Sequence, residues 1–105
     1  RQSLEMREEL GDRSGMATSI GCLGENELGR GNLDKAEELL TQALQQMEAL
    51  GMKSSIAETQ FDLAQLWQRR NNPDRAQHHY AIARDLYTQL GAAKDLERLD
   101  RAFNR

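Results

Sequence analysis

The dipeptide Leu-Gly recurs at residues 10–11, 50–51 and 90–91, always 40 residues apart. When residues 11–50 are aligned with residues 51–90 without gaps, ten of the forty positions are identical. A fixed period of this length is typical of proteins built from stacked supersecondary units, each of which buries its apolar face only against its neighbours. The sequence therefore predicts a repeat array rather than a domain with one large enclosed core.

The second half of each repeat predicts an amphipathic helix. Asp34-x-x-Glu37 is a start signal of the capping-box type, and Asn72-Pro73-Asp74 opens the equivalent segment 40 residues later. Gly51 and Gly91 follow the last apolar positions and favour a left-handed helix end. The apolar positions lie on one helix face, because they advance by three or one residue in the first repeat and by four or three in the second. They are Ala36, Leu39, Leu40, Ala43, Leu44, Met47 and Leu50 in the first repeat, and Ala76, Tyr80, Ala83, Tyr87 and Leu90 in the second.

The sequence also predicts a helix in the first half of each repeat. Its apolar positions are Met16, Ala17, Ile20, Leu23, Gly24 and Leu28, then Ile56, Ala57, Leu63, Ala64 and Trp67, and Ser55-x-x-Glu58 is a further capping box. Short joints at residues 30–32 and 70–72 are rich in turn formers, so successive helices should run antiparallel. With a single proline and few β-branched residues, the chain predicts an all-α fold of stacked antiparallel helical hairpins.

The two ends of the chain fall inside the repeat pattern. Residues 1–10 align with the second helix of a preceding repeat, residues 11–50 and 51–90 are two full repeats, and residues 91–105 align with a first or capping helix of a following repeat. We therefore expect residues 1–105 to be one segment of a longer array. Its apolar ends could support a homo-oligomer, since these side chains would need covering: Leu4, Met6 and Leu10, and Leu96, Leu99 and Phe103.

Charge and composition argue against several classes of function. The formal net charge is −3, so a nucleic-acid partner is not expected, and no apolar stretch is long enough to span a membrane. The single cysteine, Cys22, cannot form an internal disulfide, which suits a reducing, cytoplasmic setting. His78 and His79 are adjacent on a helix and do not easily chelate one ion. No catalytic motif, cofactor site or metal site is recognisable, and we expect a protein without enzymatic activity.

These residues resemble the tetratricopeptide repeat family, in a long variety with about 40 residues per repeat. The family's first-helix pattern of a large residue, Leu-Gly and an aromatic residue at fixed spacing is met by Ile20, Leu23, Gly24 and Glu27, then by Gln60, Leu63, Ala64 and Trp67. Its second-helix pattern is met by Ala36, Leu40 and Ala43, then by Ala76, Tyr80 and Ala83. Small residues at these positions allow two helix backbones to approach closely.

The resemblance implies a right-handed superhelix whose first helices line a concave groove that binds a peptide or a partner protein, within a larger scaffold or regulatory protein. The alternative is a self-associating structural spacer. By the family pattern, the groove-lining residues are Thr18, Gly21, Cys22, Glu25 and Leu28, then Glu58, Phe61, Asp62, Gln65 and Arg69, then Arg98, Arg101 and Arg105.

Three alternatives stay open at this level. The contrast between Glu25, Glu58 and Asp62 and the later arginines would complement a partner segment of mixed charge, but charges on solvated helix faces need no partner. Gly21 leaves room either for a ligand or for a neighbouring helix. Phe61 and Leu66 lie off the main apolar stripe, and are either exposed anchors for a partner or packing residues between repeats.

Overall fold

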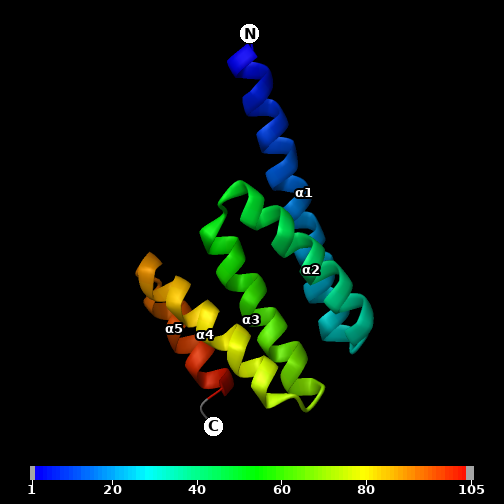
Figure 1. Ribbon diagram of the computed structural model, residues 1–105, viewed down its shortest axis with the longest axis vertical. Helices are drawn as coiled ribbons and strands as arrows, with labels where there is room; N and C mark the ends of the chain where they lie inside the picture. The colour runs from blue at the N-terminus through cyan, green and yellow to red at the C-terminus, as the bar shows by residue number, and fades with distance from the viewer. Residues whose placement is uncertain (1, 104–105) are drawn as a thin grey trace. The chain divides into compact units, whose positions relative to one another are not determined.

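The computed structural model describes the backbone of residues 2–103 and the side chains of residues 11–103, and the described chain is helical with short joints (Figure 1). It divides into two compact units, Arg1–Met52 and Lys53–Arg105. The first unit holds two helices and the second holds three, namely α1 (Gln2–Arg30), α2 (Leu33–Leu50), α3 (Lys53–Arg69), α4 (Pro73–Leu90) and α5 (Ala93–Phe103). The all-α fold of helical hairpins expected from the sequence is confirmed.

Helix α1 differs from the expectation, because it runs without a break through Leu10–Gly11. Residues 1–10 therefore do not form a separate helix that ends before residue 11. The turns after α2 and α4 differ from this position, since each follows its glycine with an apolar residue, Met52 or Ala92, that is half-buried. Such an apolar contact commonly accompanies a left-handed helix end. Asp12 occupies the corresponding position after Gly11 and is exposed.

The ends of α2 and α4 are as predicted. Gly51 and Gly91 both adopt left-handed backbone conformations, with φ of 69° and 67°. The amide of Met52 donates to the carbonyl of Met47 at 3.0 Å, and the amide of Ala92 donates to the carbonyl of Tyr87 at 3.0 Å. These bonds use carbonyl groups that the helix itself leaves without partners, so each glycine ends its helix and lets the chain turn back.

The starts of the helices differ in detail from the predicted capping boxes. Asn32, not Asp34, precedes α2, and its side chain donates to Glu27 at 2.7 Å instead of capping the helix. Asn72 precedes α4 and does cap it, because its Oδ1 accepts from the amide of Arg75 at 3.2 Å. Helix α3 begins at Lys53, so the predicted box that starts at Ser55 lies within the first turns of the helix.

The first unit is the antiparallel hairpin of α1 and α2. Small residues dominate the contact: Ala17 and Gly24 of α1 are buried, as are Ala36 and Ala43 of α2. A Cβ atom added at Gly24 would lie 2.8 Å from Cγ of Leu40 and 3.1 Å from its backbone nitrogen. The two backbones therefore approach closely enough at this point that only glycine fits without a shift.

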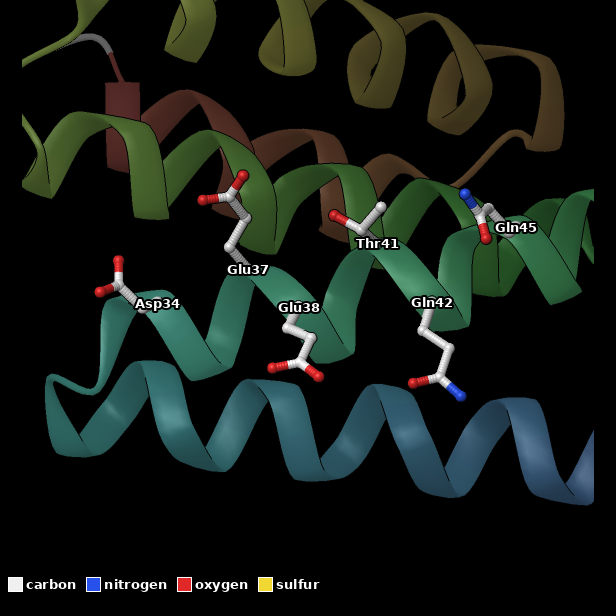
Figure 2. Close-up of a pocket in the computed structure, with 6 residues that line it drawn as sticks. All are labelled: Asp34, Glu37, Glu38, Thr41, Gln42 and Gln45. Carbon is white, nitrogen blue, oxygen red and sulfur yellow. The ribbon is translucent and has the colours of Figure 1, made fainter.

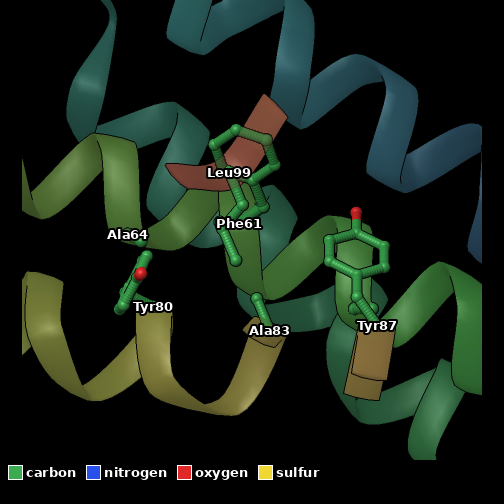
Figure 3. Close-up of a cluster of buried hydrophobic side chains, with 7 residues drawn as sticks. Phe61, Ala64, Tyr80, Ala83, Tyr87 and Leu99 are labelled. Carbon is green, nitrogen blue, oxygen red and sulfur yellow. The ribbon is translucent and has the colours of Figure 1, made fainter. Parts of the chain in front are cut away.

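The second unit has a core to which all three of its helices contribute (Figure 3). Helix α3 provides Ala57, Phe61 and Ala64, helix α4 provides Tyr80, Ala83 and Tyr87, and helix α5 provides Leu99. Leu96 and Phe103 pack against this cluster, and Leu99 is fully buried. The expectation of an uncovered apolar end at these three residues is therefore wrong, because α5 turns its apolar face onto its own unit. The other expected apolar end, Leu4, Met6 and Leu10, lies outside the described side chains.

A polar pair of one buried and one half-buried side chain joins α3 to α4. Gln60 is almost fully buried, and its Oε1 accepts a hydrogen bond from Nδ1 of His79 at 2.6 Å. Burial lowers the pKa of His79 below its ordinary value of 6.5, and the neighbouring His78 and Arg75 act in the same direction. The neutral imidazole is thus the form that the folded unit favours.

We expect the second unit to lose stability as the pH falls below about 6.5, because there the unfolded chain binds a proton at His79 that the folded chain binds less readily. Replacing Gln60 with Ile and His79 with Leu installs the residues found 40 positions earlier, and should weaken this dependence. Urea unfolding of both proteins, followed by the fluorescence of Trp67 between about pH 5 and about pH 8, measures the effect.

The exposed neighbour His78 supplies the control for this experiment. His78→Gln removes one histidine from the same helix but leaves the Gln60–His79 pair in place, so most of the pH dependence should persist, because burial is the largest cause of the lowered pKa of His79. An equal pH dependence in the wild type and in the Gln60→Ile, His79→Leu variant would rule out the assignment to His79.

Candidate functional site

In α1, some of the residues that the family pattern assigns to the groove are exposed and the others are buried. Thr18, Cys22 and Glu25 are exposed and follow one another at helical spacing on one side of the helix. The hydroxyl of Thr18 donates to the carbonyl of Ser14 at 3.0 Å. We call these three residues the α1 surface.

Gly21 and Leu28 do not belong to the α1 surface, because both are buried. A Cβ atom at Gly21 would lie 3.2 Å from Cε of Met47 and 3.8 Å from Cβ of Ala43. Both neighbours belong to α2, so of the two alternatives for Gly21 the neighbouring helix is the one that uses the space. Helical spacing alone could not decide this, since Gly21 lies between the two faces.

Phe61 is not an exposed anchor, since only 5% of it is accessible. Its ring centroid is 6.3 Å from that of Phe103 on α5. The guanidinium carbon of Arg98 lies over the Phe61 ring, 5.1 Å from its centroid. Leu66 is fully buried as well. Both residues therefore pack within the protein, and the ring of Phe61 lies beneath the exposed side chain of Arg98.

Arg98 joins residues from all three helices of the second unit. Its guanidinium is 3.2 Å from a carboxylate oxygen of Asp95 and makes a long contact of 3.5 Å with the hydroxyl of Tyr87. About half of the Arg98 side chain stays exposed. Together with the exposed Glu58, these residues form what we call the α3–α5 surface: Glu58, Phe61, Tyr87, Asp95 and Arg98.

The pKa of Tyr87 depends on its burial and on the charged residues of the α3–α5 surface. Burial raises the pKa of Tyr87 to about 12. The positive charge of Arg98 acts against that rise, whereas the carboxylates of Asp95 and Glu58 add to it. The hydroxyl therefore stays neutral near pH 7 and can donate a hydrogen bond as well as accept the one from Arg98.

The sequence predicts Arg98 as a groove residue, but its ion-pair partner, Asp95, was not identified from the sequence. Asp95 precedes Arg98 by three residues, and Glu97 precedes Arg101 by four and lies 2.8 Å from it. Both spacings bring side chains together on a helix, and could have been found in the sequence. The arginines of α5 are consequently paired with carboxylates on their own helix, so the positive charge expected at this end is partly neutralised.

The remaining predicted groove residues are distributed along α3 and α5. Asp62 and Gln65 are half-buried, whereas Arg69 and Arg101 are exposed. Arg105 lies outside the described residues. Of the predicted set, the structure brings Glu58, Phe61 and Arg98 together.

A shallow hollow of about 410 Å³ lies on the exposed side of α2. It is lined by Asp34, Glu37, Glu38, Thr41, Gln42 and Gln45, which all come from one helix. Figure 2 shows that these side chains diverge, with Glu38 and Gln42 directed away from Glu37 and Thr41. They do not converge on one point, as the lining of a ligand site would.

Among residues 11–103, no group of three or more histidine, cysteine and acidic side chains is arranged to hold a metal ion. Within the same part of the chain, none of the helices has the length and apolar character needed to cross a membrane.

Comparison with known proteins gives one match. The family model described as the tetratricopeptide repeat matches residues 15–89, which covers α2 and α3 completely and most of α1 and α4. Neither the comparison with curated proteins nor the comparison with solved structures gave a match.

Proposed function

Because the chain belongs to the tetratricopeptide repeat family, whose members typically mediate interactions between proteins, we propose that it is a non-catalytic module that binds a peptide or a partner protein. Binding takes place on the side of the first helices, in the concave groove that the family pattern assigns to them. The module works within a larger scaffold or regulatory protein of the cytoplasm, with no nucleic acid as partner.

The observation that carries the proposal is the arrangement of Arg98 over Phe61 beside Glu58. The guanidinium is half exposed, so an acidic group of a partner can reach it without displacing any backbone. If Arg98 turns toward that group, the ring of Phe61 beneath it becomes available for apolar contact. Glu58 is exposed and binds a basic group of the same segment.

This geometry favours a short segment that carries a basic residue, an apolar residue and an acidic residue. The charge pattern supplies orientation and specificity, because a segment bound in the reverse direction would place like charges together. The apolar contact with Phe61 supplies burial, which exposed ion pairs alone would not provide.

We expect Glu58→Lys to weaken the binding of such segments by about tenfold or more, because it replaces an attraction with a repulsion. The measurement is a screen of an array of short peptides with the purified chain, followed by titration of the best binders against the variant. Circular dichroism establishes that the variant stays helical.

Asp85→Lys is the matched control, since Asp85 is also an exposed carboxylate of the second unit but lies on α4, outside the α3–α5 surface. Peptide affinities that fall equally for both variants would indicate a general effect of charge. Affinities unchanged by Glu58→Lys and by Arg98→Glu would place binding elsewhere on the chain.

A further inference from the structure

Helix α1 has an apolar face that α2, the other helix of its unit, leaves uncovered. Met16 is 59% exposed and Leu23 is 54% exposed. Ile20 lies between them and is half-buried. The spacing of four and three residues aligns them along one side of the helix, where Arg13 and Glu27 continue the row. We call these five residues the outer α1 face.

The outer α1 face is separate from the surfaces already described. Ala17, Gly21, Gly24 and Leu28 are buried, the two glycines against α2, and Thr18, Cys22 and Glu25 form the α1 surface. The equivalent position in the second repeat shows how unusual the exposure is, because Leu63, 40 residues after Leu23, is only 3% exposed. Large apolar side chains that gather in one exposed row mark an interaction surface.

A shallow groove runs beside this row in the first unit. It has a volume of about 300 Å³ and is lined by Arg13 and Met16 of α1 and by Gln46 and Leu50 of α2. An apolar side chain from a partner could enter it between the two helices. The groove lies at the Met16 end of the row and not at the Leu23 end.

We propose that the outer α1 face binds a second copy of the chain, with the two α1 helices antiparallel about a two-fold axis close to Ile20. Arg13 and Glu27 each lie seven residues from Ile20, on opposite sides of it. The two-fold axis therefore places Arg13 of each copy opposite Glu27 of the other. It also directs Leu23 of each copy toward the groove beside Met16 of the other, so the face is complementary to itself.

Charge determines the direction of the pairing. In a parallel arrangement Arg13 would meet Arg13 and Glu27 would meet Glu27, and both contacts would be repulsive. Glu27 is held in place by Asn32 at 2.7 Å and by Arg30 at 3.5 Å. Its carboxylate is thus already positioned and can accept a further hydrogen bond, because a carboxylate accepts several.

Sedimentation velocity over a wide concentration range tests the pairing. We expect the wild-type chain to form a dimer as concentration rises, and Leu23→Glu to raise the dimer dissociation constant at least about tenfold, because a charge would enter the apolar groove. Leu90→Glu is the control, since Leu90 is the large apolar residue exposed in the second unit, and should leave the dimer intact.

Two further experiments test the geometry. Arg13→Glu should weaken the dimer, and the added change Glu27→Lys should restore it, because the pair is then reversed and not lost.

In a Cys22→Ser background, a short bismaleimide should join copies that carry Ile20→Cys near the axis but not copies that carry Thr18→Cys on the other side of α1. A wild type that stays monomeric, a dimer that Leu23→Glu leaves intact, or binding of a different protein to this face without self-association would overturn the proposal.

Discussion

Replacing Leu99 with Ala is expected to lower the free energy of unfolding of the second unit by about 2–5 kcal/mol. Leu99 is fully buried in the cluster that joins α3, α4 and α5, and it is the residue of α5 that belongs to that buried cluster. Truncation removes apolar burial and leaves a cavity that the surrounding helices only partly fill. Phe61 and Tyr80, which contact Phe103 on α5, would lose the support of that helix.

The chain's single tryptophan makes this effect measurable. Trp67 lies in the second unit, with the guanidinium carbons of Arg70 and Arg75 4.9 Å and 4.6 Å from its ring, so its fluorescence should change when that unit unfolds. Arg101→Ala is the control on the same helix, since Arg101 is exposed, and should change stability by no more than about 0.5 kcal/mol. Equal urea midpoints for the two variants would mean that α5 does not close the core.

Gly24→Ala is expected to destabilise the first unit by about 1–3 kcal/mol, although alanine is the better helix former. The added Cβ atom would lie 2.8 Å and 2.9 Å from two side-chain carbons of Leu40. Leu40 is fully buried, and its backbone nitrogen is only 3.1 Å away, so the helices themselves must move apart. Thermal unfolding followed by circular dichroism measures the change.

Gly15→Ala provides the matched control within the same helix. Beyond the backbone of α1 itself, no atom lies within 4 Å of a Cβ atom built at Gly15, so this variant should gain about 0.5–1 kcal/mol from the lower conformational freedom of the unfolded chain. The two substitutions are chemically identical and are expected to have opposite signs. A gain in stability for both would show that α1 and α2 do not approach as closely at Gly24 as the structure places them.

The hairpins were predictable because their signals are local. The apolar steps from Ala36 to Met47 fix the face that α2 buries, and glycines followed by an apolar residue end α2 and α4. The same rule does not predict the uninterrupted α1, since Asp12 follows Gly11 but the equally polar Asn32 follows Gly31, where α1 ends. A repeat of the Leu-Gly dipeptide in the sequence therefore does not by itself imply a repeat of the turn in the structure.

The candidate site was less predictable, because burial depends on residues distant in sequence. Spacing places Phe61 and Glu58 on neighbouring parts of α3, but cannot show that Arg98, 37 residues after Phe61, covers its ring. Spacing likewise assigns Gly21 to the groove, whereas the position of Met47 on α2 shows that the room is used within the hairpin.

The sequence by itself determined the helical class, the hairpins and the family resemblance, since periodicity, turn residues and small residues act within one or two helices. Only the tertiary structure decided which side chains of those helices stay accessible. Met16 and Leu23 are exposed whereas Leu63, at the position equivalent to Leu23, is buried, because burial depends on the side chains that pack around a residue and not on the pattern that the two hairpins share.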